Sequence, residues 1–200
     1  MARKPRSQVL YDGCCAHVFS RAIEKRWIFL EPEDFKEFIR LLQAMRGMGG
    51  YRLYHCCVMI THFHLVLGLE KLGDFSKALQ QIKWQYTHYF NVKYKRYGPL
   101  WRERFKSMLI EDERYLAVCG QYVEYNPVKA NLALRSEDWP YSSSRFYFSG
   151  EEDPLLCRYD GPQEFPKEPV DIKNDAFFTK GDGIGSALFK FCLRKGIRRP

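Results

Sequence analysis

Short β-prone runs alternate with longer helical segments through the first two thirds of the chain, and this order constrains the fold most strongly. The runs CCAHVFS (14–20), YRLYHCCVMI (51–60), HFHLVLGL (62–69) and FKSMLI (105–110) are rich in residues favoured in strands. Segments with apolar residues at helical spacing lie between and after these runs. The order strand, helix, strand, strand, helix, strand, helix predicts an α+β fold in which helices pack on an antiparallel sheet.

The first two helices are bounded by clear start and stop residues. Residues 32–45 carry apolar side chains at helical spacing, and the glycine at position 47 is expected to end this helix. A second helix is expected to begin at Gly73 and to break at Gly98 and Pro99. Each helix has one apolar face, so both are expected to pack on the sheet.

Length and composition favour one packed domain followed by an extension. With 46% hydrophobic and 16% aromatic residues, the chain has enough apolar surface to fold. Single domains cluster near about 100 to 150 residues. The composition changes after Asn131, and a stretch rich in proline and glycine follows from Pro154 to Pro169. We therefore predict one domain over 1–148 and, over 149–200, a linker and a basic C-terminal extension with a short helix from Ile184 to Leu193.

Charge and cysteine content narrow the function classes. Lysine and arginine outnumber the acidic residues by 32 to 24, and the net charge of +8 favours a polyanionic partner such as nucleic acid. The seven cysteines are odd in number and lack CxxC spacing, which fits neither a disulfide framework nor a zinc ribbon. No run approaches about 18 apolar residues. We expect a soluble cytoplasmic protein that does not enter a membrane.

The sequence His62-Phe63-His64 is the first candidate for chemistry. It lies in a predicted strand, where the period of two directs both imidazoles to one face and Phe63 to the other. Such a pair can hold a metal ion, but it is also compatible with two hydrogen-bonded core histidines. A third ligand from another element would favour the metal site.

The third helix, expected to start after Asp112 and to stop at Pro127, offers that ligand. Tyr122 and Asn126 are four residues apart and therefore share one helical face. The pair would supply a nucleophile and a ligand together, or else a core aromatic and a residue at a helix end. Tyr125 is a competing nucleophile, but it projects from a different part of the helix surface.

Several longer segments resemble the single-tyrosine HUH transposases, in the insertion-sequence-200-like family and its branch of REP-associated tyrosine transposases. The resemblance covers residues 9–148. It rests on HFHL at 62–65, on the run YFNVKYKRYGPLWRERFKSMLIED, on YVEYNPVKANL at 122–132 and on DWPYSS at 138–143, which occur in the order that this family shows. Where many relatives have an asparagine before the first histidine, this chain has Thr61.

The resemblance implies a fold, a cofactor and an activity. It implies a ferredoxin-like fold, usually dimeric, and an enzyme that cleaves and rejoins single-stranded DNA near hairpins with Mg²⁺ or Mn²⁺. It assigns Tyr122 as the nucleophile that forms a 5′-phosphotyrosine intermediate. The metal ligands would be His62, His64 and Asn126. Such a protein would be associated with the nucleoid.

Basic and aromatic residues near these motifs are candidates for DNA contacts. Six basic side chains are expected to contact DNA phosphates, and unpaired bases are expected to stack on indole or phenol rings. The candidate cations are Arg21, Lys83, Arg102, Arg104, Lys106 and Lys129, and the candidate stacking residues are Trp84, Trp101 and Tyr97.

Two other functions stay open on the sequence alone. The first is a domesticated protein that binds hairpin DNA and no longer transposes. The second is a replication-initiator nuclease, which shares the same chemistry, although nothing in this chain suggests a helicase domain. A two-histidine phosphoesterase is excluded, because that class needs two separated HxT/S motifs and this chain has a single HxH.

Overall fold

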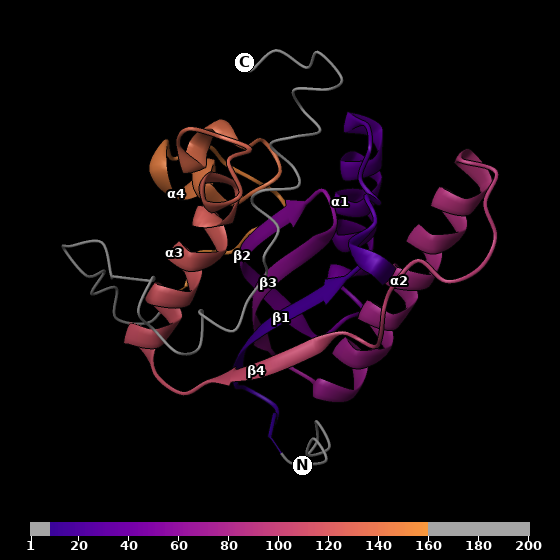
Figure 1. Ribbon diagram of the computed structural model, residues 1–200. Coiled ribbons are helices and arrows are strands. Elements are labelled where there is room, and N and C mark those ends of the chain that lie inside the picture. Colours follow the sequence, from indigo (N-terminus) through magenta and orange to yellow (C-terminus); the bar gives the residue numbers. More distant parts are fainter. Residues whose placement is uncertain (1–8, 160–200) are drawn as a thin grey trace.

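The computed structural model describes residues 9–159, and Figure 1 shows how their helices and strands are arranged. The elements of the fold run, in chain order, β1 (Cys15–Arg21), α1 (Pro32–Arg46), β2 (Tyr51–Met59), β3 (His62–Leu69), α2 (Leu72–Lys93), β4 (Lys106–Ile110) and α3 (Glu113–Lys129). Short pieces complete it, namely the 3-10 turns Ile23–Lys25 and Ser136–Asp138 and the helix α4 (Ser144–Phe148).

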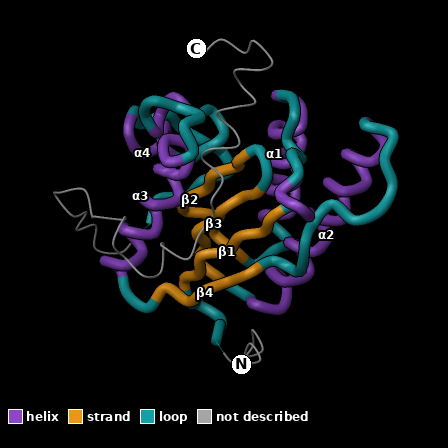
Figure 2. Tube along the Cα trace, viewed as in Figure 1, coloured by secondary structure: helices purple, strands orange, loops and turns teal. Residues whose placement is uncertain are grey.

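The four strands form one antiparallel sheet in the order β2-β3-β1-β4. Helices α1 and α2 cover one face of this sheet and α3 covers the other (Figure 2). This strand order, with the element order β-α-β-β-α-β, is that of a ferredoxin-like fold. The predicted α+β class and the ferredoxin-like architecture are both confirmed.

Strand β3 is buried along its whole length because both of its faces are covered. Its odd-numbered residues, such as Phe63, Leu65 and Leu67, enter the core beneath α1 and α2. The even-numbered Val66 belongs to a second cluster beneath α3. Since successive side chains of a strand point to opposite faces, His62 and His64 also face α3.

Helix α2 is amphipathic, as its spacing predicted. Its buried residues include Phe75, Leu79, Ile82 and Tyr86, whereas Trp84 on the opposite side is 66% exposed. No helix within the described part of the chain is long and apolar enough to cross a membrane.

The carboxylate of Asp34 ties the start of α1 to the end of α2. Asp34 is fully buried, and its side chain accepts hydrogen bonds from the backbone N–H groups that precede α1. It also accepts hydrogen bonds from the side chains of Tyr89, Lys93 and Tyr94. Burial raises the pKa of this carboxyl, but these donors outweigh burial and hold the pKa below its ordinary value. Asp34 is therefore a charged link between two helices.

Helix α3 continues two residues past Pro127, where we predicted its end, and that prediction is wrong. A proline has no N–H to donate to the carbonyl four residues earlier, which here belongs to Val123. The side-chain Nδ2 of Asn126 donates to this carbonyl oxygen at 3.3 Å and to that of Tyr122 at 2.8 Å. The helix can therefore keep its last turn across the proline.

The packed chain extends beyond Phe148, where we predicted the domain to end. Leu155 and Leu156 are buried in the core, and the N–H of Cys157 donates to the carbonyl of Leu53 in β2. The predicted boundary at 148 thus falls inside the packed part of the chain. The predicted helix 184–193 and the basic tail lie outside the described residues.

Gly120 lets α3 approach β2 closely. A Cβ atom at this position would lie 2.4 Å from Nε2 of His55. The His55 ring has little freedom to move, because its Nδ1 contacts Glu124 at 2.9 Å and its face stacks on Tyr147 at 4.4 Å. The position of α3 on the sheet therefore depends on a residue without a side chain.

We predict that Gly120→Ala lowers the free energy of unfolding by about 1–3 kcal/mol, because the new methyl group overpacks the contact with His55. By helix propensity alone, the change from glycine to alanine would stabilise the helix by about 1 kcal/mol. A loss of stability would therefore be due to packing. Chemical denaturation measures the effect. Gly73→Ala in α2 is the matched control, since a Cβ there meets nothing within 4 Å; equal effects of the two substitutions would contradict the prediction.

We predict that Asp34→Asn lowers the free energy of unfolding by about 3 kcal/mol, because it leaves the Lys93 ammonium without its buried partner. The folded pKa of Asp34 is lowered, so its contribution is present above the unfolded pKa and is lost as the pH falls through the folded pKa. The difference between wild type and variant should therefore shrink in acid. The control is Glu37→Gln, which removes the surface ion pair between Glu37 and Arg40. It should lower the free energy of unfolding by less than about 1 kcal/mol.

Candidate active site

The two histidines of the HxH motif lie on β3 and face α3. His62 is 5% and His64 is 3% exposed, and their ring centroids are 5.0 Å apart. Phe63 between them is packed in the core on the other face of the sheet. The predicted alternation is confirmed, and the two imidazoles form a pair beneath α3.

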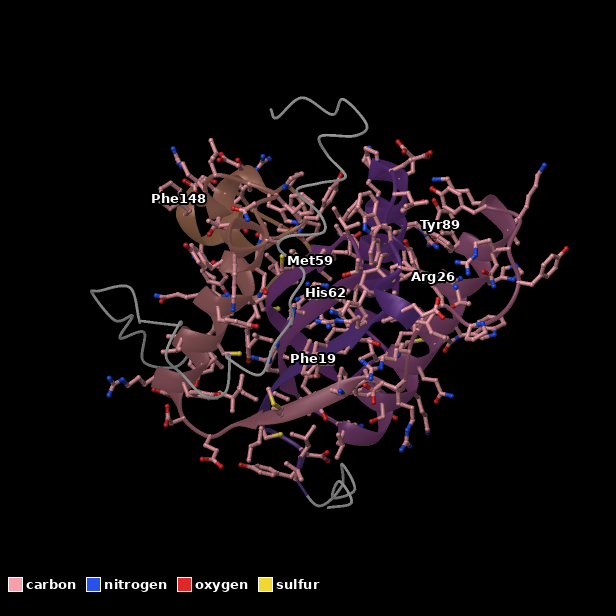
Figure 3. The ribbon with its side chains drawn as sticks, in the orientation of Figure 1. Phe19, Arg26, Met59, His62, Tyr89 and Phe148 are labelled. Carbon is pink, nitrogen blue, oxygen red and sulfur yellow. The ribbon has the colours of Figure 1, made fainter. Side chains whose placement is uncertain are left out.

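Residues of the neighbouring strands surround this pair. In the strand register, Arg21 of β1 and Met59 of β2 lie opposite His62, and Phe19 of β1 lies opposite His64. Figure 3 shows His62 with Met59 and Phe19 near the centre of the molecule. The Phe19 and His64 rings stack with their centroids 5.7 Å apart. The histidines thus lie at the middle of the sheet.

A third histidine, His17 of β1, contacts this pair and was not identified from the sequence. Its Nε2 lies 2.9 Å from Nδ1 of His64, and the two rings stack with centroids 5.1 Å apart. Burial lowers the pKa of His17 to about 4. Burial, followed by electrostatic interactions with His62, His17 and Arg21, also holds the pKa of His64 well below its ordinary value. Both imidazoles are therefore neutral at neutral pH. For His64 this is the state that metal coordination requires.

His62 has a hydrogen-bond partner in Thr61, which lies between β2 and β3. The hydroxyl Oγ1 of Thr61 lies 2.9 Å from Nδ1 of His62. Thr61 directly precedes the HxH motif, and its hydroxyl gives this histidine a hydrogen bond.

Tyr122 lies on the face of α3 that packs on the histidines. It is 9% exposed, and its ring centroid lies 6.0 Å from that of His64 and 6.3 Å from that of His17. The ammonium of Lys129, one helical turn beyond Asn126, lies over the Tyr122 ring at 5.6 Å. Tyr125 is 44% exposed and packs in neither core cluster. The structure therefore brings Tyr122, and not Tyr125, to the histidine pair.

Asn126 is buried one turn after Tyr122 on the same helix face. Its Nδ2 donates to two backbone carbonyls of α3, and its Oδ1 accepts no hydrogen bond from the described residues. Anchoring of the amide nitrogen fixes the direction of the oxygen, which stays available to a ligand.

These donors fit a divalent cation that keeps open positions. Nε2 of His64 is buried and has no hydrogen-bond partner within residues 9–159, so it is available for coordination in the tautomer that carries the hydrogen on Nδ1. In the same part of the chain no three His, Cys, Asp or Glu side chains gather as a metal site. The Asn126 carboxamide, on the face of α3 that carries Tyr122, offers an oxygen of the kind that such a cation takes.

Five of the six candidate DNA-binding cations are at least partly accessible. Arg21 lies opposite His62 in the register of β1 with β3, and the backbone N–H of Arg102 donates to the backbone carbonyl of Arg21. Lys106 at the start of β4 lies opposite Phe19 and pairs with Glu103 at 2.8 Å. Arg104 and Lys129 are exposed. Arg21, Arg102 and Lys106 thus lie at the end of the sheet that carries the HxH motif.

Lys83 and Trp101 lie differently from the other candidates. Lys83 is 8% exposed, and its ammonium donates to the carbonyl of Glu103 and lies 5.2 Å over the Trp101 ring. Trp101 packs on Phe63 and Tyr86. Both residues contact the segment around the loop before β4. Among the candidate stacking residues, Trp84 and Tyr97 are exposed, at 66% and 94%.

Comparisons with known proteins agree with this architecture. A curated protein of Haemophilus influenzae, described as a REP-associated tyrosine transposase, is 33% identical over 97 residues, which cover 44% of this chain and 55% of that protein. The match thus spans little more than half of the relative's length. A REP-associated tyrosine transposase solved in complex with a REP hairpin superposes with a TM-score of 0.64 at 19% identity, covering 84% of this chain and 98% of that one.

The family assignment follows from the longest match. Residues 11–126, more than half of the chain, match the family described as "Transposase IS200 like". The match begins just before β1 and ends at Asn126, so it includes the HxH motif and Tyr122. The chain belongs to the family of IS200-like transposases.

Proposed function

We propose that the protein is a metal-dependent DNA transposase that cleaves and rejoins single-stranded, hairpin-flanked DNA through Tyr122. The observation that carries the proposal is the position of the Tyr122 ring, 6.0 Å from the His64 ring across the interface of α3 with the sheet. The proposed nucleophile and the two histidines proposed as metal ligands come from distant parts of the chain and lie together there. Family membership supports a DNA-processing role.

The reaction is a transesterification that conserves the phosphodiester bond energy. The phenol oxygen of Tyr122 attacks phosphorus, a bond from phosphorus to tyrosine forms, and the bond to the 3′ oxygen breaks. The products are a 5′-phosphotyrosine and a strand with a free 3′-hydroxyl. A second 3′-hydroxyl can reverse the step on another strand, so joining needs no ATP.

His62, His64 and Asn126 would hold Mg²⁺ or Mn²⁺ through two imidazole nitrogens and one amide oxygen. The bound cation would withdraw charge from the phosphoryl oxygens and so promote attack by a phenol. The three ligands are neutral and leave the full divalent charge for the phosphate. Lys129, over the Tyr122 ring, adds a positive charge beside the nucleophile.

DNA binding would use the cations near the HxH end of the sheet. Arg21, Arg102 and Lys106 lie close to the histidine pair or to the strand beside it, and they are suited to contacts with phosphates. Exposed Trp84 and Tyr97 offer rings for unpaired bases. A hairpin is the expected substrate, since the similar solved transposase is bound to one. We also propose a homodimer that acts in the cytoplasm at the nucleoid.

We expect Tyr122→Phe to abolish the covalent product and to reduce cleavage by at least about 1,000-fold, because the nucleophilic oxygen is lost. The measurement is a gel shift that resists denaturation, with labelled single-stranded hairpin DNA from the repeats of its own genome and Mg²⁺ or Mn²⁺. Tyr125→Phe is the matched control and should form the adduct normally. Hairpin binding by the wild type without any adduct would instead favour a domesticated DNA-binding protein.

We expect chelation of divalent metal to stop cleavage, and re-addition of Mn²⁺ to restore it. His64→Ala should raise the Mn²⁺ concentration needed for half-maximal cleavage by more than about 100-fold, because one of three protein ligands is lost. His88→Ala replaces an exposed histidine on α2 and should behave as wild type. Undiminished cleavage in the presence of a chelator would refute the metal dependence.

A further inference from the structure

We propose that His17 is a positioning residue, which holds His64 in the tautomer whose Nε2 lone pair faces the site. The inference rests on the proposed metal site. It goes beyond that site because His17 would not touch the cation and would act only through its hydrogen bond to His64.

The hydrogen bond itself has two possible directions, and the need for a coordinating lone pair on His64 distinguishes them. A neutral imidazole carries one N–H and one lone pair. If His17 donated to Nδ1 of His64, then Nε2 of His64 would carry the hydrogen. That atom is buried without a partner in the described chain, so a buried N–H would lack an acceptor and no lone pair would be left to coordinate. Donation from Nδ1 of His64 to Nε2 of His17 leaves the Nε2 lone pair of His64 for the cation. It places the hydrogen of His17 on its Nδ1, which is also buried.

The position of His17 makes it a fixed acceptor. It lies on β1, between β3 and β4, in register with Val66 on one side and Met108 on the other. The ring is 2% exposed and nearly parallel to that of His64, with an interplanar angle of 17°. A polar ring at a buried sheet position is unfavourable unless it is hydrogen-bonded. This one has a hydrogen-bond partner in a candidate metal ligand.

His62 is held in a similar way by a different group. The Thr61 hydroxyl meets Nδ1 of His62 at the same distance, 2.9 Å. The Nδ1 atom of each imidazole in the HxH pair thus faces a hydrogen-bonding neighbour. Partners of this kind fix ring orientation and raise ligand basicity. Within the HxH pair, replacing His17 should therefore remove the hydrogen bond of His64 and leave that of His62.

The first test measures Mn²⁺ binding to the DNA-free protein by electron paramagnetic resonance. His17→Phe, which keeps a ring but offers no acceptor, should weaken Mn²⁺ binding by about 10- to 100-fold. His17→Gln, whose amide oxygen can accept near the same point, should recover most of the affinity. His88→Phe serves as the control for loss of a histidine elsewhere and should bind as wild type.

The second test reads the tautomer directly and needs no metal. In the metal-free wild type, ¹⁵N chemical shifts of the imidazole rings should show the His64 hydrogen on Nδ1. A hydrogen on Nε2 of His64 would overturn the inference, even if His17→Phe failed to fold. Wild-type affinity in folded His17→Phe would overturn the inference alone, whereas absence of Mn²⁺ binding in the wild type would overturn the metal site as well.

Discussion

Antiparallel pairing of β1 with β3, covered by α3, is the constraint on which the site depends. The pairing places His17, Phe19 and Arg21 on the same sheet face as His62 and His64. Helix α3 then closes this face with Tyr122, at a separation set by the absence of a side chain at Gly120. A shift of one residue in the register would send every one of these sheet side chains to the opposite face.

The two faces of the sheet have different compositions because they serve different purposes. Beneath α1 and α2 the core is almost entirely apolar, with interlocking rings such as Phe29, Phe38 and Tyr86. This face can supply most of the hydrophobic stabilisation of the domain. Beneath α3 the core is smaller and includes polar side chains. Stability from the first face can offset the cost of burying polar groups on the second.

The polar groups beneath α3 are buried at a cost that hydrogen bonds largely offset. His17 contacts His64, Thr61 contacts His62, and Asn126 donates to the carbonyl that Pro127 cannot serve. Glu124 likewise contacts His55 and accepts from Ser143, which connects α3 to β2 and to the chain before α4. These contacts hold the helix that carries Tyr122 against the sheet.

Periodicity and breaking residues in the sequence predicted the α+β class, the seven main elements and the shared face of His62 and His64, because these are local properties of the chain. The motifs also predicted the membership in the transposase family that the comparisons confirmed. The helix end at Pro127 was predicted wrongly, because a side chain at position 126 replaces the missing donor.

The contacts between distant elements could not be read from the sequence. Periodicity assigns a face to a side chain within one strand, but it does not say which strands are neighbours or in what register. For this reason His17 was missed, although it lies in a correctly predicted strand. Local spacing determined the elements and their faces, whereas long-range strand pairing and helix packing decided which polar groups meet.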